Sequence, residues 1–327
     1  MEIIRKIESR IISFLEPGKV NILYGARRVG KTYLLKKIAA EQNVSYLWLN
    51  GELPEVQEIL ATKNLNNYKN LFAGFQLVII DEAQAIPKVG QILKIIVDEL
   101  PHLKIIASGS SAFDLTNKLG EPLVGRAFWH EMYPVAQLEI SMQENILETI
   151  KNKDERLVFG SYPEVINLVG FDRKEEYLKD LVNAYLLKDI LSLEGIRNAS
   201  KIYYLLKLIA FQLGKEVSLN ELGTQLGISK NTIEKYLDLL EKVFVLKKIT
   251  GFSKNLRKEI TKTSRWYFWD NGIRNAIIHD FKALSLRNDT GELWENYLIG
   301  ERLKKNEYER ANKEMYFWRT YDQQEID

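Results

Sequence analysis

The sequence contains no cysteine, which excludes disulfides, thiolate catalysis and cysteine-ligated zinc sites. It also lacks any run of about eighteen consecutive apolar residues, so we expect no transmembrane helix and no membrane partner. The first residues, MEIIRKIESRIISFLEPGK, have the pattern of an amphipathic helix broken by charged residues rather than that of a signal peptide. These absences predict a cytoplasmic protein.

A dominant charge of either sign is also missing. Lys and Arg number 46 against 44 Asp and Glu, which leaves a formal net charge of +2. Whole-molecule charge therefore says little about partners, and the local distribution of charge has to be used instead. With 327 residues, 46% of them hydrophobic, the chain is too long for one ordinary domain, and two or three domains are expected.

A glycine-rich turn lies in the stretch ILYGARRVGKTYLL, residues 22–35, where Gly25, Gly30, Lys31 and Thr32 fit G-x-x-x-x-G-K-[ST]. The glycines let successive backbone N–H groups point at phosphate oxygens, Lys31 can reach the β- and γ-phosphates, and the Thr32 hydroxyl can hold Mg²⁺. A strand-like run precedes this loop and a helix-like pattern follows it, as a phosphate-binding loop requires. The predicted nucleotide-binding residues are Gly25, Ala26, Arg27, Arg28, Val29, Gly30, Lys31, Thr32 and Tyr33. Arg27 and Arg28 either contact the nucleotide or pair with a carboxylate.

Two carboxylates follow a buried strand in FQLVIIDEAQAI, where four apolar residues lead into Asp81 and Glu82. A continuous apolar run is typical of a parallel strand covered on both faces, and ligands gather at the carboxyl ends of such strands. Asp81 is expected to hold Mg²⁺ through water, and Glu82 is expected to act as the general base. Together with the phosphate loop, this pattern predicts Mg²⁺-dependent hydrolysis of a nucleoside triphosphate, and Glu82 argues against binding without turnover.

Three further residues are catalytic candidates with open alternatives. In HLKIIASGSSA, Ser108 or Ser110 either orients the attacking water or the γ-phosphate, or belongs to a simple turn. In LVGRAFWHEMYPV, Arg126 either neutralises transition-state charge, from a lid or from a neighbouring chain of a homo-oligomer, or is a solvated loop residue.

After Pro134 the pattern becomes helical, and KEVSLNELGTQLGISKNTIEKYLDLLEKVFVLKKI then predicts a winged helix-turn-helix. Ser218 and Ser229 are expected N-caps, with Gly227 in the turn between the two helices. The second helix would present Lys230, Asn231 and Lys235 to nucleic acid.

The predicted wing, KKITGFSKNLRKEITKTSR, carries seven Lys or Arg residues against one Glu. This local excess of positive charge favours contact with DNA phosphates through Lys254, Arg257 and Lys258, and replacing these three with Ala should weaken duplex binding and flatten its salt dependence. The alternative is a protein partner, with the lysines on a solvated face.

The segment from residue 269 contains a helix glutamate and a strand that leads to Asp327 in EMYFWRTYDQQEID. Such a pair is half of a restriction-endonuclease-like metal site, whose other half is a Glu-x-Lys on the next strand. That half is absent from the sequence, so we expect either a truncated segment or a remnant.

With these motifs in place, the chain resembles prokaryotic AAA+-like ATPases in which a P-loop core precedes a C-terminal domain of unknown function. It is also similar to archaeal ATPases of the signal-transducing P-loop branch. The resemblance rests on GARRVGKTYLL, LVIIDEAQ, IIASGSSA and LVGRAFWHEMYP, and in the C-terminal part on FGSYPEV, YLKDLVNAYLLKDI, YFWDNGIRNA, GELWENYLIGERL and FWRTYDQQEID.

The resemblance implies a parallel sheet with strand order 5-1-4-3-2, ATP as the nucleotide, and a C-terminal part similar to PD-(D/E)XK nucleases. Glu295 and Asp327 match the nuclease pattern. The resulting prediction is an α/β protein with a P-loop ATPase core (1–140), a helical lid (141–214), a winged helix (215–268) and an incomplete α+β nuclease-like part (269–327).

The expected function is Mg²⁺-dependent ATP hydrolysis that drives a DNA- or protein-binding winged helix. The alternatives are a nucleotide-gated binding module with little turnover and an ATP-regulated nuclease.

Overall fold

Two units make up the fold: Ile4–Tyr133 form the first, and Met1–Ile3 together with Pro134–Asp327 form the second. The computed structural model describes residues 2–62, 64–110, 121–186, 198–252, 264–311, 313–319 and 325–326. Across these described ranges, no helix combines the length and apolarity that a membrane span requires.

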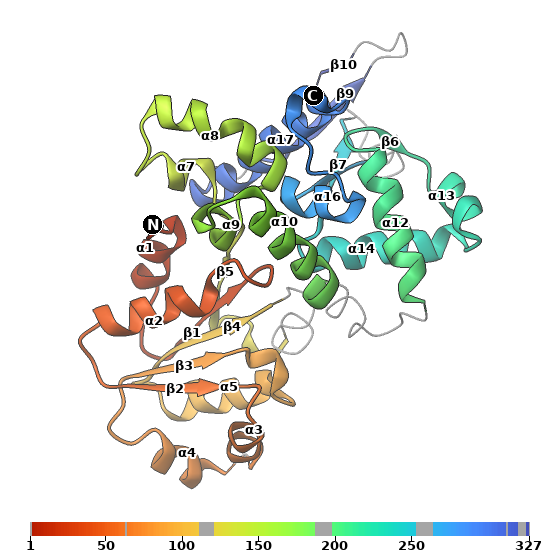
Figure 1. The fold of residues 1–327 in the computed structure, drawn as a ribbon. Helices are drawn as coiled ribbons and strands as arrows, with labels where there is room; N and C mark the ends of the chain where they lie inside the picture. The colour runs from red at the N-terminus through yellow and green to blue at the C-terminus, as the bar shows by residue number, and fades with distance from the viewer. Residues whose placement is uncertain are drawn as a thin grey trace. The chain divides into compact units, whose positions relative to one another are not determined.

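A five-stranded parallel sheet forms the centre of the first unit (Figure 1). Its strands are β1 (Lys19–Tyr24), β2 (Tyr46–Asn50), β3 (Leu77–Asp81), β4 (Lys104–Gly109) and β5 (Ala127–Glu131). They lie in the order β2-β3-β4-β1-β5, with each neighbouring pair parallel. This is the predicted order 5-1-4-3-2 read from the other edge, so the predicted α/β core is confirmed.

Helices cover both faces of this sheet. Helices α1 (Lys6–Ser13) and α2 (Lys31–Glu41) lie on one face, and α3 (Pro54–Ala61), α4 (Leu65–Leu71) and α5 (Val89–Glu99) lie on the other (Figure 1). Short 3-10 turns, η1 (Ala83–Ala85) and η2 (Glu121–Leu123), connect some of these elements. Because both faces are covered, all five residues of β3 are buried, which explains its continuous apolar run.

Strand alternation decides which face of the sheet each polar residue occupies. Val78 and Ile80 of β3 belong to the apolar cluster that includes the buried residues of α5. Ile79 and Asp81 therefore point to the opposite face, where α2 lies. Ser108 of β4 follows the same rule, since Ile105 and Ala107, at the alternate positions of this strand, belong to the α5 cluster. The sheet thus carries Asp81 and Ser108 to the α2 side of its carboxyl edge.

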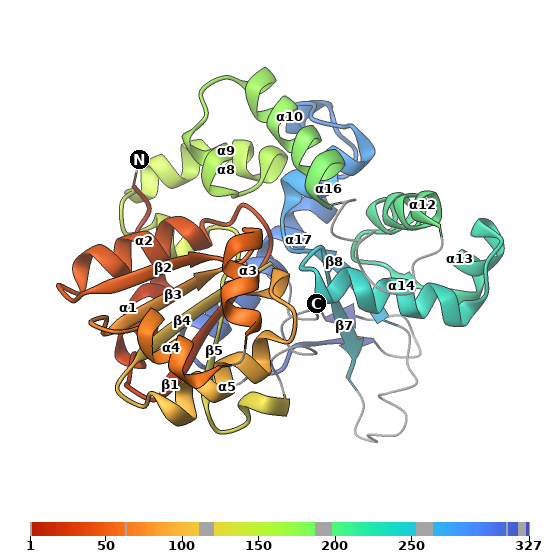
Figure 2. The same cartoon turned by 90° about the horizontal axis from the view of Figure 1, so that it is seen from below.

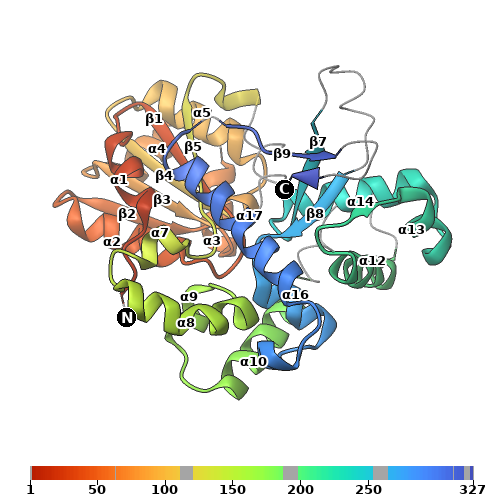
Figure 3. The same cartoon turned by 90° about the horizontal axis from the view of Figure 1, so that it is seen from above.

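The second unit contains a helical group around α16 (Asn271–Ile278), which packs against α8 (Ile146–Phe159), α10 (Phe171–Asp180), α12 (Ala199–Phe211) and α17 (Thr290–Tyr308) (Figure 3). Its shorter elements are α7 (Gln137–Ile140), α9 (Pro163–Asn167), the π-helix η3 (Leu181–Leu186) and the 3-10 turn η4 (Leu284–Leu286).

Two further helices, α13 (Leu219–Leu226) and α14 (Lys230–Lys242), are joined by a tight turn (Figure 2). The Ser218 and Ser229 hydroxyls accept N-cap hydrogen bonds from Glu221 and Thr232, as predicted, and Gly227 ends α13 with a φ of 63°. A left-handed residue at this position favours glycine, because a side chain there is strained.

A second sheet accompanies this pair of helices. Its strands are β6 (Glu216–Val217), β7 (Leu246–Gly251), β8 (Ser264–Phe268), β9 (Tyr316–Arg319) and β10 (Glu325–Ile326), in the order β10-β9-β7-β8-β6. Strand β7 pairs antiparallel with β8 and parallel with β9, so strands from segments 215–268 and 269–327 share one sheet. The boundaries predicted within the second unit stay a prediction.

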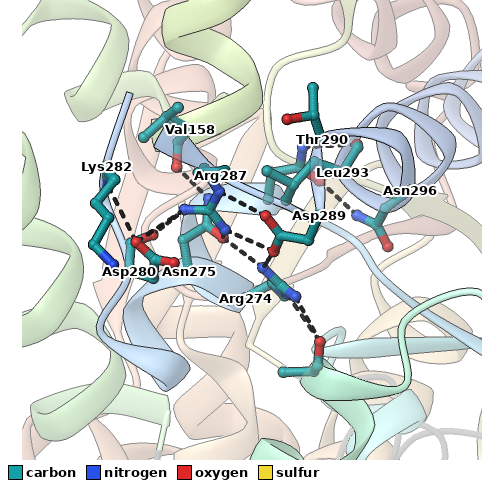
Figure 4. A network of polar contacts seen from close by, with 12 residues as sticks. Val158, Arg274, Asn275, Asp280, Lys282, Arg287, Asp289, Thr290, Leu293 and Asn296 are labelled. Carbon is teal, nitrogen blue, oxygen red and sulfur yellow. Dashed lines mark hydrogen bonds and ion pairs between the residues drawn. The ribbon is translucent and has the colours of Figure 1, made fainter. Parts of the chain in front are cut away.

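A buried ionic network joins the elements around α16 (Figure 4). Arg287 donates from Nε and Nη2 to the two carboxylate oxygens of Asp289, each at 2.8 Å, and Arg274 donates to the same carboxylate. Burial alone would raise the pKa of Asp289, but the hydrogen bonds from Arg287 and Arg274 outweigh it and lower this pKa to about 2. Arg274 also donates to the Ala210 carbonyl of α12 at 2.7 Å, which ties α12 to α16.

Candidate active site

The phosphate loop connects β1 to α2 at the carboxyl edge of the sheet. Gly25 and Gly30 both have left-handed or otherwise positive φ values, 150° and 98°. A Cβ atom on Gly25 would lie 2.0 Å from the carbonyl oxygen of Met132, so no larger residue fits there. Helix α2 begins at Lys31, directly after Gly30, so the backbone N–H groups of its first turn belong to the loop. This arrangement suits an anion, because a helix N-terminus carries partial positive charge.

Lys31 lies inside the curve of the loop and is only 5% exposed. Its ammonium donates to the carbonyl oxygens of Gly25, at 2.9 Å, and Ala26, at 2.8 Å. The loop therefore places a buried cation at the point where phosphate oxygens would enter. Of its other predicted contact residues, Arg28 is exposed, Arg27 is half-buried, and Tyr33 is 59% exposed at the start of α2.

The two halves of the predicted site meet directly. The Thr32 hydroxyl, from α2, donates to a carboxylate oxygen of Asp81, from β3, at 2.8 Å. Asp81 is 7% exposed. Residues far apart in the sequence thus converge because the parallel sheet brings the end of β3 beside the loop that follows β1.

The residues beyond Asp81 complete a polar cluster. The Ser108 hydroxyl donates to the other carboxylate oxygen of Asp81 and accepts from the backbone N–H of Glu82 at 3.2 Å. Glu82 adopts the left-handed conformation, with a φ of 52°. Non-glycine residues rarely adopt it, and such strain is concentrated at functional sites. The cluster therefore holds Glu82 at the edge of the sheet.

Gln84 is a residue that the sequence reasoning missed. Its side-chain amide donates to the Glu82 carboxylate, at 2.5 Å, and to the Ser110 hydroxyl, at 3.3 Å. Ser110 thus reaches the site through Gln84, whereas Ser108 contacts Asp81 directly. The signal available in the sequence was the spacing Glu82-x-Gln84 immediately after the buried strand.

Arg126 lies elsewhere. Its carbonyl accepts a hydrogen bond from Val20, near the amino ends of β1 and β5, whereas the phosphate loop follows the carboxyl end of β1. The guanidinium pairs with Asp98 of α5, with Nε 2.7 Å from Oδ1 and Nη2 3.1 Å from Oδ2, and this hydrogen bond lowers the pKa of Asp98. Within one chain, Arg126 is therefore at the opposite edge of the sheet from the site.

The donor set fits a hard cation. Thr32 and Asp81 offer a hydroxyl and a carboxylate oxygen, the kinds of ligand that Mg²⁺ prefers. Among the residues that the structure describes, no group of three or more His, Asp or Glu side chains could hold a metal by itself.

The nuclease-like glutamate of the second unit is engaged with its neighbours. Glu295 accepts from the Tyr267 hydroxyl at 2.6 Å and lies 3.9 Å from Arg265. Burial, followed by this hydrogen bond, raises the pKa of Tyr267. A Cβ on Gly214 would lie 2.7 Å from the Glu295 carboxylate, so α17 packs closely there. Asp327 lies outside the described residues.

The predicted nucleic-acid residues of α14, Lys230, Asn231 and Lys235, are all exposed. The exposed residues of the same helix also include Glu234 and Asp238, so its surface charge is mixed. Lys254, Arg257 and Lys258 lie outside the described residues.

Three stretches of the sequence match models of known families. Residues 17–141 match an AAA domain, which contains the whole cluster from Gly25 to Ser110. Residues 150–287 match a domain of unknown function, DUF8612, and residues 290–327 match another, DUF4143. The chain joins an AAA domain to a DUF4143 segment. An AAA domain is a nucleotide-binding P-loop domain of the ATPase class, so the convergence of Thr32 and Asp81 occurs in a fold of that class.

The chain is also similar to several curated proteins. An uncharacterized protein of Methanocaldococcus jannaschii is 25% identical over 334 residues, which cover 94% of this chain and 71% of that protein. An uncharacterized protein of Mycobacterium tuberculosis is 24% identical over 327 residues, which cover 99% and 70%.

Among solved structures, the RuvB Holliday junction branch migration motor of Thermotoga maritima is 19% identical with a TM-score of 0.36, covering 74% of this chain and 84% of that one. A Signal Transduction ATPase with Numerous Domains from Pyrococcus horikoshii is 13% identical with a TM-score of 0.35, covering 93% and 46%.

Proposed function

We propose that this chain is a Mg²⁺-dependent ATPase whose nucleotide state controls a DNA- or protein-binding winged helix. The observation that carries the proposal is the 2.8 Å hydrogen bond between Thr32 and Asp81 in an AAA domain. It supports one shared centre for the phosphate loop and the carboxylates, with Lys31 held beside it.

Each residue of the cluster has a role in this proposal. Lys31 binds the β- and γ-phosphates, and Thr32 and Asp81 hold Mg²⁺, which would neutralise phosphate charge when bound. Glu82 accepts a proton from the water that attacks the γ-phosphorus, while the bond from that phosphorus to the β–γ bridging oxygen breaks. Ser108 orients Asp81 and the Glu82 backbone, and Gln84 orients the Glu82 carboxylate.

The arrangement of α13, α14, β7 and β8 supports a winged helix. Two capped helices with a glycine turn are followed by an antiparallel pair of strands, which is the order of elements in that motif. Lys230, Asn231 and Lys235 of α14, with Lys254, Arg257 and Lys258 of the wing, would contact DNA phosphates. Glu234 and Asp238 on α14 would repel them, so a protein is the second candidate partner.

Steady-state ATP turnover, measured with Mg²⁺ and with or without duplex DNA, tests the proposal. We expect turnover in the wild type and none in Lys31→Ala. Lys36→Ala is the matched control, because Lys36 is exposed on the same helix over the Trp48 ring. Stimulation by DNA supports the enzyme, whereas ATP-dependent DNA binding with negligible turnover supports the nucleotide-gated module. If calorimetry detects no binding of nucleotide in the presence of Mg²⁺, both the enzyme and the nucleotide-gated module are excluded.

An ATP-regulated nuclease is the weaker alternative. It requires Glu295 as a metal ligand, and the hydrogen bond from Tyr267 to Glu295 does not support that role.

A further inference from the structure

We propose that Arg5 is a positioning residue that links the phosphate loop to the place where the chain passes between its two units. This inference rests on the proposed nucleotide binding and adds how that binding reaches the rest of the chain. Arg5 immediately precedes α1, in a segment whose sequence predicts only an amphipathic helix.

The Arg5 guanidinium is buried and forked between two backbone carbonyls. It is 6% exposed, and it donates from Nη1 to the carbonyl of Val29, at 2.6 Å, and from Nη2 to that of Tyr133, at 2.7 Å. A planar guanidinium can hold two acceptors in fixed directions at once, which an ammonium on a flexible stem cannot do as rigidly. Hydrogen bonds from a buried charged donor are also stronger than neutral ones. Arg5 therefore fixes the distance between these two carbonyls.

Val29 belongs to the phosphate loop itself. It lies between Arg28 and Gly30, whose φ values are 63° and 98°, and it directly precedes the glycine before Lys31. In the present structure, Lys31 donates to the Gly25 and Ala26 carbonyls. In the proposed nucleotide complex, Lys31 would transfer these hydrogen bonds to phosphate oxygens, which would leave the Gly25 and Ala26 carbonyls to find other partners. We infer that the loop backbone adjusts in response and that the Val29 carbonyl, in the same loop, moves with it.

The chain passes from one unit to the other at two places, between Ile3 and Ile4 and between Tyr133 and Pro134. Arg5 lies two residues after the first of these boundaries, and Tyr133 lies directly before the second. The hydrogen bond from Arg5 to the Tyr133 carbonyl therefore joins the chain segments next to these two boundaries. The residues next to these two boundaries have hydrogen bonds within the second unit: Val135 donates its backbone N–H to the Ser161 carbonyl at 2.8 Å, and the Gln143 side chain donates to the Glu2 carbonyl at 2.6 Å. A shift of the loop would therefore reach the end of the first unit, at Tyr133, through Arg5.

Hydrogen–deuterium exchange of the full chain tests this inference. It compares the peptides that cover residues 130–140, with and without Mg²⁺ and a non-hydrolysable ATP analogue, in the wild type, Arg5→Lys and Arg5→Ala. In the wild type we expect nucleotide to change the exchange rate at Val135 and its neighbours by about tenfold, within the range of typical coupling between sites. In Arg5→Lys we expect nucleotide to bind within about tenfold of the wild-type affinity, while most of that change is lost.

Lys6→Ala is the matched control, because Lys6 is the next residue and is exposed. It should respond as the wild type does. Thermal melting identifies any variant that fails to fold, and Arg5→Lys keeps the buried positive charge in case Arg5→Ala does not fold. A folded Arg5→Lys that binds nucleotide and shows the full wild-type response at 130–140 overturns the inference. A wild-type chain that takes up no nucleotide overturns the proposed function instead, so the two failures are distinguishable.

Discussion

In both the AAA domain and the second unit, polar residues from distant segments lie close together, but the two polar clusters differ in their position and in their partners. In the AAA domain, Thr32, Asp81 and Glu82 meet at the open carboxyl edge of a sheet, with Thr32 and Glu82 half-buried. In the second unit, Asn271 and Asn296 meet in the core and donate to backbone carbonyls. The residues of the first cluster are the ones proposed to bind nucleotide and Mg²⁺, whereas Asn271 and Asn296 satisfy backbone carbonyl groups in the core.

Asp270 illustrates the second use. Its carboxylate accepts from the backbone N–H groups of Ser161, at 2.7 Å, and Gly272, at 2.9 Å, and so caps α16 while tying it to the segment after α8. Burial is the main cause that raises its pKa, and the backbone hydrogen bonds oppose that rise. The motifs FGSYPEV and YFWDNGIRNA therefore meet through Asp270 as parts of a scaffold.

Of the changes that distinguish the candidate active site from the polar core of the second unit, we expect Glu82→Gln to have the largest effect. Without the carboxylate, the attacking water loses its proton acceptor, so we expect kcat to fall by about 10²- to 10⁴-fold. ATP binding should remain, because the phosphate contacts of the loop are unchanged. Single-turnover hydrolysis and calorimetry measure the two quantities, with the exposed Glu52→Gln as control. Full hydrolysis in Glu82→Gln would exclude Glu82 as the base.

In the second unit, Asn296→Ala should damage stability rather than chemistry. Asn296 is 1% exposed; its side chain accepts from the Phe268 N–H at 2.7 Å and donates to the Phe268 carbonyl at 3.0 Å. Truncation leaves two buried backbone groups unpaired, so we expect the free energy of unfolding to fall by about 2–4 kcal/mol.

Urea unfolding measures that loss, and the exposed Asn220→Ala on α13 is its control. Nucleotide affinity should be unchanged in the folded variant. A large drop in affinity with normal stability would show that the two clusters are not separate in function.

Acid should weaken the second unit through Asp289. Its pKa is lowered to about 2, below the usual value of 3.8, so its stabilising contribution is complete above about pH 4 and is lost as the pH falls toward 2. We expect the difference in unfolding free energy between the wild type and Asp289→Asn to be at most ~2.5 kcal/mol at pH 5 and to vanish near pH 2. Asp172→Asn, on the exposed surface of α10, should show no such dependence. A difference that is constant with pH would contradict the ionic role of Asp289.

The smallest effect should be at the surface of α14. Replacing both Lys230 and Lys235 with Ala removes two phosphate contacts, so we expect duplex affinity to fall by about tenfold and the slope of log affinity against log salt to decrease by about 2. Fluorescence anisotropy at several salt concentrations measures both, with the exposed Lys242→Ala as control. An unchanged slope would indicate that this helix binds a protein.

Much of the AAA domain could be predicted from the sequence because its signals are local. The phosphate loop needs glycine at Gly25, where a Cβ atom would clash with the Met132 carbonyl, and a strand buried on both faces needs a continuous apolar run. The resemblance then supplied the strand order, which the sheet confirms.

Other features could not be predicted, because a residue's neighbours in sequence do not reveal its partners from distant segments. Arg126 follows a glycine beside a strand, as a site arginine would, but it lies at the amino end of β5 and pairs with Asp98. Glu295 matches the nuclease pattern that the resemblance implies, and the structure adds that its carboxylate accepts a hydrogen bond from Tyr267.

By itself, the sequence determined the order of strands, loops and helices and the residue types at the end of each buried strand, since these follow from short-range periodicity and backbone conformation. Only the tertiary structure decided which distant groups form hydrogen bonds, such as Arg5 with the Tyr133 carbonyl and Asn275 with the Val158 carbonyl. The physical reason is that a buried polar group must find an acceptor or donor wherever packing places one, and packing joins segments more than a hundred residues apart in this chain.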